Sequence, residues 1–243
     1  MAGPSSTGDA AAILAARDAG RRQTPAARAT LLLSLAGRAH GDPLDLPIGA
    51  RDGALIDLRE HWFGTRFDCL ADCATCGETI EIAFDAAQIR DVAAIAGTIV
   101  DYETEGRTWR VRVPTTRDLM VAAATADPLR ARAILLERCL IDTADTPSED
   151  AAHAIANALA AADPQADVLF DTTCPACGTS TTLPFDIAAH LWIEIDRWAE
   201  EVLDDVHALA SSYGWSEADI LALPPSRRRA YLDRASRSAG SIQ

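Results

Sequence analysis

Two copies of the pattern C-x-x-C-G stand far apart in this chain, and they constrain its fold more than any other feature. The first copy covers residues 73–77 and the second covers residues 174–178. A two-residue spacing lets both sulfurs of a pair reach one ion, and the glycine that follows permits the left-handed turn of a knuckle. The sequence therefore predicts one site clamped by both copies, with the 97 residues between Cys76 and Cys174 leaving and returning beside it.

Four cysteine sulfurs suit a tetrahedral zinc ion. The predicted ligands are Cys73, Cys76, Cys174 and Cys177. A closed site of four thiolates leaves no open coordination position, so we expect zinc to serve the structure rather than a reaction. Rubredoxin-like iron uses the same spacing, and a redox dithiol or vestigial cysteines are further alternatives. Cys69 is a spare ligand candidate that we interpret as an ordinary thiol, and Cys139 is interpreted as a core residue.

Hydrophobic patterning predicts an α+β fold in which a zinc-ribbon-like β core carries a largely helical insertion. Residues 79–85 place apolar side chains at alternate positions, as a strand does, and residues 98–114 are typical of a hairpin that turns at Glu105 and Gly106. A capping box formed by Thr146 and Glu149 predicts a helix over residues 147–162.

The clearest periodicity follows the second cysteine pair, where apolar residues recur every three or four positions. It predicts one amphipathic helix of about 27 residues with an acidic opposite face, which either is solvated or docks a partner. The apolar stripe consists of Ile187, Leu191, Ile195, Trp198, Val202, Val206, Leu209 and Tyr213. Gly214 is predicted to end this helix, and Ser216 and Ser226 to cap two short helices after it.

These patterns divide the chain into five segments. They are a loosely ordered N-terminus at 1–23, a helical arm at 24–66, a zinc-ribbon-like region at 67–186 with a helical insert at 115–163, a long helix with a short helical tail at 187–235, and a disordered C-terminus at 236–243.

Charge and motif content narrow the function. The net charge of −14 argues against broad nucleic-acid binding, which requires cationic surface. All 22 basic residues are arginine, so a P-loop or Schiff-base lysine is excluded, and no familiar catalytic motif is present. The N-terminus does not resemble a signal peptide, and the longest apolar run is too short to span a bilayer. We therefore expect a cytoplasmic, non-enzymatic protein without a membrane partner.

Several stretches together resemble one known family. They are LPIGARDGALIDLREHWFG, CATCGETIEIAFD, VRVPTTRDL, ILLERCL, DPQADVLFDTTCPACG and PFDIAAHLWIEIDRWAEEVLDDVHALASSYGWSEADILALPPSRRRAYLD. In that order they resemble the baseplate hub assembly chaperones of T-even phage tails, and more closely the bacterial members encoded beside extracellular contractile injection systems. The resemblance covers about residues 40–235, and the family's cysteine pairs fall on the four predicted ligands.

The resemblance implies a non-enzymatic assembly factor whose partners are baseplate hub or spike proteins of a contractile tail-like particle. Its tail motif gives the candidate partner-binding residues, which are Tyr213, Trp215, Ile220, Leu223, Arg228 and Tyr231. A competing role for Trp215 and Tyr231 is to pin the tail to the body. The alternative functions are a structural baseplate subunit of the same machine and a zinc-ribbon protein that contacts nucleic acid or the transcription apparatus.

Overall fold

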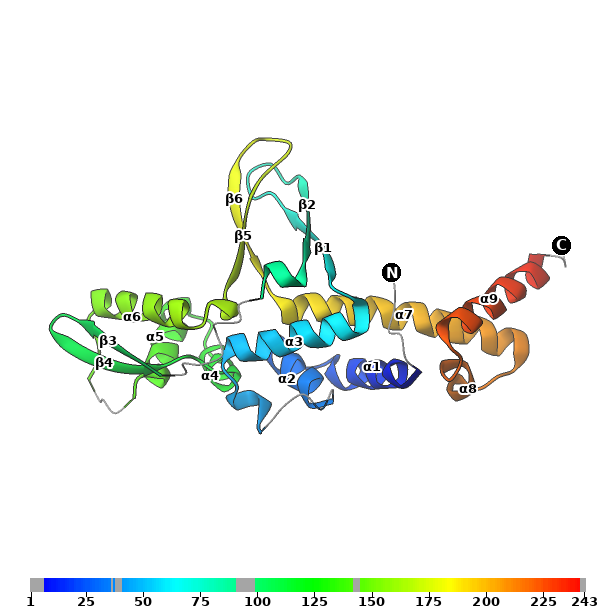
Figure 1. The fold of residues 1–243 in the computed structure, drawn as a ribbon, viewed down its shortest axis with the longest axis horizontal. Helices are drawn as coiled ribbons and strands as arrows, with labels where there is room; N and C mark the ends of the chain where they lie inside the picture. The colour runs from blue at the N-terminus through cyan, green and yellow to red at the C-terminus, as the bar shows by residue number, and fades with distance from the viewer. Residues whose placement is uncertain (1–6, 36, 38–40, 91–98, 142–144, 241–243) are drawn as a thin grey trace.

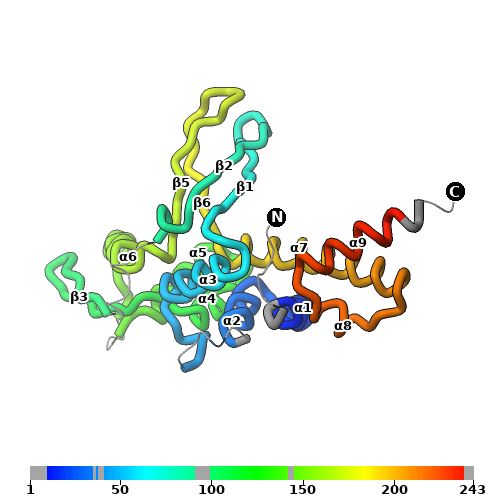
Figure 2. Tube along the Cα trace, turned by 45° about the vertical axis from the view of Figure 1, so that its right-hand side comes forward, coloured from blue at the N-terminus to red at the C-terminus, as the bar shows by residue number. Residues whose placement is uncertain are grey.

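A computed structural model gives the fold, and it describes residues 7–35, 37, 41–90, 99–141 and 145–240. A helical body lies at the centre, two β-hairpins rise from it side by side, and an inserted subdomain and a C-terminal helical arm extend to opposite sides (Figures 1 and 2). The chain is thus a mixture of helices and small antiparallel sheets, as predicted. None of the helices in the described ranges has an apolar stretch sufficient to cross a lipid bilayer.

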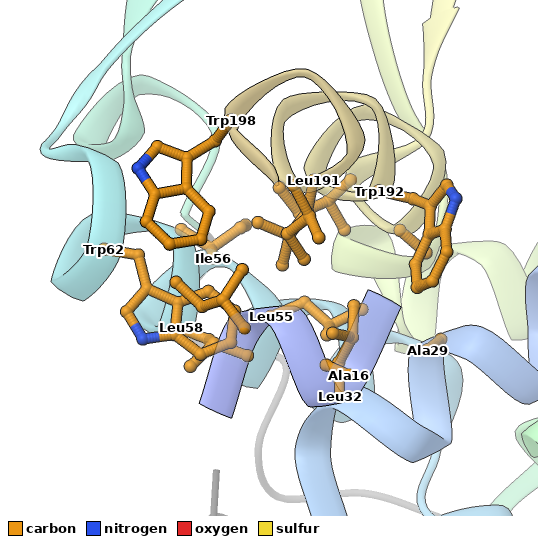
Figure 3. Packing of buried hydrophobic residues seen from close by; sticks show 14 of the residues in the cluster. Ala16, Ala29, Leu32, Leu55, Ile56, Leu58, Trp62, Leu191, Trp192 and Trp198 are labelled. Carbon is orange, nitrogen blue, oxygen red and sulfur yellow. The ribbon is translucent and has the colours of Figure 1, made fainter. Parts of the chain in front are cut away.

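The body consists of four helices and a short 3-10 turn. They are α1 (Thr7–Gly20), α2 (Pro25–Leu35), η1 (Pro43–Asp45), α3 (Ile48–Phe63) and α7 (Ile187–Tyr213). Helix α7 is 27 residues long, and its apolar stripe supplies much of the core. Figure 3 shows Leu55 and Ile56 of α3 beside Leu191 of α7. Burial of this stripe stabilises the fold by roughly 2 kcal/mol for each fully buried large side chain.

The prediction that residues 1–23 are loosely ordered is wrong for helix α1. Its Ile13 is fully buried in the main core, and its Arg17 is 2% exposed and pairs with Asp196 and Glu200 of α7. The segment is rich in alanine, which favours helix more than any other residue, and its apolar positions recur at helical spacing. Residues 1–6 lie outside the described part of the chain.

The two hairpins that rise from the body repeat the same design. Strands β1 (Arg66–Asp72) and β2 (Thr79–Asp85) form the first hairpin, and β5 (Val168–Thr173) and β6 (Ser180–Phe185) form the second. In each hairpin the two strands are joined by a loop of six residues, the first of which is a cysteine. The residue pairs that flank these loops are Asp72 with Thr79 and Thr173 with Ser180. Both C-x-x-C-G sequences therefore form the tips (Figure 1).

The inserted subdomain between the hairpins is built from a third hairpin and three helices. Its elements are η2 (Ala86–Gln88), β3 (Ile99–Thr104), β4 (Arg107–Arg112), α4 (Thr116–Ala122), α5 (Pro128–Cys139), α6 (Glu149–Ala162) and η4 (Pro164–Ala166). The predicted turn at Glu105 and Gly106 is confirmed, and both residues have positive φ. Trp109, Val111 and Ile155 form a small core of this subdomain.

Two predicted helix starts are wrong by a few residues. The cap of α6 is Ser148, whose Oγ accepts a hydrogen bond from the N–H of Ala151, rather than Thr146. In the C-terminal arm, α8 (Glu217–Leu221) begins after the predicted cap Ser216, but Ser226 lies inside α9 (Pro225–Gly240). Proline at the first helical position needs no amide partner, so α9 opens at Pro225, two residues before the start that a cap at Ser226 predicts.

The prediction of a disordered C-terminus from residue 236 is also wrong, because α9 continues to Gly240. Its sequence contains no proline or glycine between residues 226 and 239, so nothing interrupts the helix before its end. Residues 241–243 lie outside the described part of the chain.

Gly49 at the start of α3 joins the body to the insertion, and we expect its replacement by alanine to destabilise the protein. The N–H of Gly49 donates to Oδ2 of buried Asp163 at 2.9 Å, and an added Cβ would overlap Oδ1 and the carboxyl carbon of the same side chain. We expect Gly49→Ala to lower the free energy of unfolding by about 2 kcal/mol. Gly53→Ala in the same helix meets open space and should be neutral or stabilising by up to about 1 kcal/mol. Urea unfolding of both variants checks this pair, and equal stabilities would contradict it.

Candidate metal centre

The four predicted ligands meet where the two hairpin tips come together. The Sγ atoms of Cys73, Cys76, Cys174 and Cys177 all lie within 4.8 Å of one another. Two of these pairs join the hairpins, with 3.8 Å between Cys73 and Cys177 and 3.7 Å between Cys76 and Cys174. The described residues hold no other group of three or more His, Cys, Asp or Glu side chains placed to share a metal ion. The predicted cysteine cluster is therefore confirmed as a geometric unit.

The same pattern of backbone hydrogen bonds shapes both tips and positions their sulfurs. In the first tip, Cys73 N–H donates to the carbonyl of Glu78 at 2.8 Å, and Gly77 N–H donates back to the carbonyl of Cys73 at 2.8 Å. In the second tip the corresponding bonds are from Cys174 to Thr179 at 2.9 Å and from Gly178 to Cys174 at 3.0 Å. These bonds fold each tip into a tight turn.

The glycine after each cysteine pair makes these turns possible. Gly77 has φ of 75° and Gly178 has φ of 73°, a left-handed conformation that side chains with a Cβ rarely adopt. The sequence signal C-x-x-C-G therefore encodes the local geometry of both tips.

The spacing of the sulfurs fits a tetrahedral metal ion. With Zn–S bonds of about 2.3 Å, tetrahedral geometry separates two sulfurs by roughly 3.8 Å, close to the distances between the hairpins. A disulfide would bring two sulfurs to about 2.05 Å, and the cysteines are free thiols. Cys73 and Cys174 are buried, whereas Cys76 and Cys177 are exposed, so an ion held here lies at the surface of the tips. The four sulfurs could thus hold a thiophilic ion.

The acidities of the thiols also suit a cation. Backbone hydrogen bonds from Cys76 and Thr75 lower the pKa of Cys73, and hydrogen bonds from the side chain and backbone of Thr179 lower the pKa of Cys177 to about 6. A hydrogen bond from the backbone of Glu78 favours the Cys76 thiolate, but partial desolvation by the packed tips and the three neighbouring sulfurs outweigh it and raise the pKa of Cys76 to about 12. A divalent cation would relieve this crowding of negative charge and deprotonate all four ligands.

An aromatic cluster holds the hairpins together at their bases. Phe67 and Phe84 stack at 4.9 Å between ring centroids within the first hairpin, and Phe84 lies 4.5 Å from Phe170 of the second. Phe185 lies edge-on to Phe67 at 5.6 Å. The cluster therefore holds the two hairpins together at their bases, next to the helical body, while the cysteines meet at their tips (Figure 1).

Sequence analysis missed this cluster, although a signal for it exists. A Phe-Asp pair stands at equivalent positions at the end of β2 and at the junction of β6 with α7, and each aspartate caps the helix that follows. Asp85 accepts a hydrogen bond from the N–H of Ala87, and Asp186 accepts one from the N–H of Ala189. The repeat therefore extends beyond the cysteine pairs to the whole hairpin and its connection to the body.

The two remaining cysteines lie outside the metal centre. Cys139 is 1% exposed at the end of α5, in agreement with the core role predicted for it, and burial raises its pKa to about 11. Cys69 is half-buried on β1, and its Sγ lies 3.6 Å from Nδ1 of His190 on α7. It is therefore not a fifth ligand of the cysteine cluster.

The candidate partner-binding residues are distributed unevenly over the C-terminal arm. Ile220 is fully buried, and Arg228 is 8% exposed with its Nε 3.4 Å from Oδ2 of Asp205. Tyr213 and Trp215 stack at 4.8 Å, and Tyr231 meets Trp215 edge-on at 4.8 Å.

This arrangement bears on what the tail residues do. Leu223 is half-buried, as are Trp215 and Tyr231, whereas Tyr213 is exposed. The aromatic contacts favour the interpretation that Trp215 and Tyr231 pin α9 against the end of α7. Among the candidates, Tyr213 offers the most surface to a partner.

Comparison of the chain with protein-family models, with curated proteins and with solved structures gave no match. The case for a metal centre consequently rests on the geometry of the four sulfurs.

Proposed function

We propose that this chain is a non-enzymatic assembly factor for the baseplate hub of a contractile tail-like injection particle, with a structural zinc ion in its four-cysteine centre. The two hairpin tips and the ion would form a zinc-ribbon-like unit that joins the hairpins flanking the insertion. The choice of a contractile particle rests on the sequence resemblance. The role as a binding protein rests on the exposed surface of the C-terminal arm.

The observation that carries the proposal is the C-terminal arm formed by α8, α9 and the second half of α7 (Figure 1). Between residues 200 and 204 this half of α7 exposes Glu200, Glu201 and Asp204 around Leu203, which is 37% exposed. An apolar side chain framed by carboxylates suits a partner helix or loop with an apolar centre and a basic rim.

The position of the metal centre supports a scaffolding role for the ion. Four thiolates from two hairpins complete its coordination, so no position is left for a substrate or a reactive water. The ion would instead fix the tips of the two hairpins to each other, at the ends that point away from the helical body. We therefore assign it a structural role and place the protein in the cytoplasm, where thiols remain reduced.

The proposal is tested by recovering tagged protein from its own cells during particle assembly and identifying bound proteins by mass spectrometry. We expect hub or spike proteins in the eluate and little of the tagged chain in purified mature particles. Fixed stoichiometric retention in particles would instead identify a structural subunit. Recovery of polymerase or nucleic acid alone would contradict the proposal.

A charge-reversal pair locates the partner surface. We expect Asp204→Arg to reduce recovery of the hub or spike protein about tenfold, because it places a cation against a basic partner rim. Glu137→Arg, which makes the same charge change at an exposed position of the inserted subdomain, should leave recovery unchanged. Equal recovery with both variants would remove the arm from the proposal.

A further inference from the structure

Cys69 lies on β1 outside the metal centre and contacts the first of three linked polar side chains. Two of these side chains come from α7 and the third comes from α3. The Sγ of Cys69 is 3.6 Å from Nδ1 of His190, and Nε2 of His190 is 3.5 Å from Oε1 of Glu194. Glu194 in turn accepts two hydrogen bonds from the guanidinium of Arg59, at 2.9 and 2.7 Å. A thiol, an imidazole facing it and a carboxylate that orients the imidazole are the parts of an activated nucleophile.

The imidazole of His190 is held in place on its faces as well as at its nitrogens. Its ring centroid lies 5.3 Å from that of Phe67 and 5.5 Å from that of Phe185. Burial by itself would lower the pKa of His190, but hydrogen bonds to Cys69 and Glu194 outweigh it and raise this pKa to about 9. This raised pKa favours the imidazolium form at neutral pH, with Nδ1 facing the sulfur of Cys69 and Nε2 3.5 Å from Oε1 of Glu194.

The sulfur opens into an apolar groove of about 440 Å³ between the hairpins and α7. Exposed Leu70 and Ile193 line this groove together with aromatic rings from both hairpins. The charged side chains that line it are Asp68, Asp186, His190, Glu194 and Arg197. The groove thus offers an apolar chain a surface that includes Cys69.

We propose that Cys69 is a nucleophile that accepts an acyl group from a thioester with an apolar acyl chain. The thiolate Sγ of Cys69, paired with the imidazolium of His190, attacks the carbonyl carbon of the thioester. The new C–S bond forms, and the bond from that carbon to the donor sulfur breaks. The electron pair leaves with the donor sulfur, which takes the Nδ1 proton of His190. The products are S-acyl-Cys69, neutral His190 and a free thiol, so atoms, charge and protons balance without an oxidant.

Two features favour this class of electrophile. An imidazolium beside a cysteine stabilises the thiolate, which is the nucleophilic form. The apolar groove stabilises an acyl chain in proportion to the apolar surface of the chain that it buries, so a longer chain binds more tightly. The site shares no ligand with the metal centre and goes beyond the proposed assembly function.

The test compares octanoyl and acetyl thioesters of N-acetylcysteamine as donors to the zinc-loaded full-length protein at pH 7. Acylated residues are identified by peptide mapping. We expect octanoyl transfer to Cys69 at least about tenfold faster than acetyl transfer, no transfer at this position in Cys69→Ser, and at least about a tenfold loss in His190→Gln. Equal rates for the two donors, or wild-type rates in His190→Gln, would overturn the proposal.

A second measurement needs no variant and so does not depend on whether His190→Gln folds. The rate of Cys69 acylation in the folded wild type is compared with its rate in the same chain unfolded in urea. An activated thiol in a binding groove reacts faster in the folded protein, whereas a thiol that is only a packing residue reacts more slowly. A slower reaction in the folded protein would overturn the proposal.

Discussion

Replacing Cys174 with serine is expected to remove the bound metal and to destabilise the protein by at least about 3 kcal/mol. Cys174 is 1% exposed, and its Sγ lies 3.7 Å from that of Cys76 on the other hairpin. A serine hydroxyl is a poor ligand for zinc, so three thiolates would remain with an incomplete site. The hairpin tips would then repel through their uncompensated thiolates. Metal content by elemental analysis and urea unfolding measure the two effects.

Cys69→Ser is the matched control, because Cys69 lies on the same hairpin but outside the cysteine cluster. This variant should keep one zinc ion per chain. Chelation of the wild type should reproduce the loss of stability seen in Cys174→Ser, since Cys76 and Cys177 are exposed and give a chelator access. A Cys174→Ser protein with full metal content and wild-type stability would refute the structural-zinc interpretation. If elemental analysis of the wild type finds iron instead of zinc, the four cysteines are still the metal ligands, and only the identity of the ion changes.

Local sequence predicts the parts of this centre well because its geometry is local. Each C-x-x-C-G forms its turn from hydrogen bonds between residues at most five positions apart, with Gly77 or Gly178 in the left-handed conformation. The alternation that leads to Phe84 likewise encodes one buried face of β2. That both tips close one site followed from chemistry, since two thiolates alone do not complete a tetrahedral site.

Local sequence patterns could not predict which side chains from distant segments come into contact. Cys69 and His190 are 121 positions apart and meet only because the first hairpin stands on α7. Arg17 belongs to a segment that was predicted to be loosely ordered, yet it is buried against two carboxylates of α7. Such pairs depend on how whole helices and strands pack against one another, and the residue pattern within one element does not predict that packing.

Replacement of Asp118 by asparagine is expected to destabilise the inserted subdomain by about 3 kcal/mol. Its carboxylate is fully buried and accepts hydrogen bonds from Arg112 of β4 and from Arg138 of α5. It also accepts from the N–H and the hydroxyl of Thr115, so it completes the capping box of α4. One side chain therefore joins a strand to two helices.

The magnitude follows from what each partner loses. Arg112 and Arg138 are about one-third exposed, so water partly solvates them once the carboxylate is gone. The cost therefore falls near the lower end of the 3–5 kcal/mol that is typical when one member of a buried pair is removed. Asp101→Asn is the control, because Asp101 and Arg110 form an exposed pair at 3.5 Å and should contribute less than about 1 kcal/mol.

The pH dependence gives Asp118 a signature that a packing defect would lack. Burial alone would raise the pKa of Asp118, but hydrogen bonds from Arg112, Thr115 and Arg138 outweigh it and hold this pKa far below its ordinary value of 3.8. The ionised carboxylate thus contributes its full stability above the ordinary value, and the contribution is lost as the pH falls below that value toward the folded pKa. Urea unfolding at pH 7, 4 and 3 should therefore show the gap between wild type and Asp118→Asn narrowing at the lowest pH. A gap that stays constant over this range would mean that Asp118 acts through its shape and hydrogen bonds rather than through its charge.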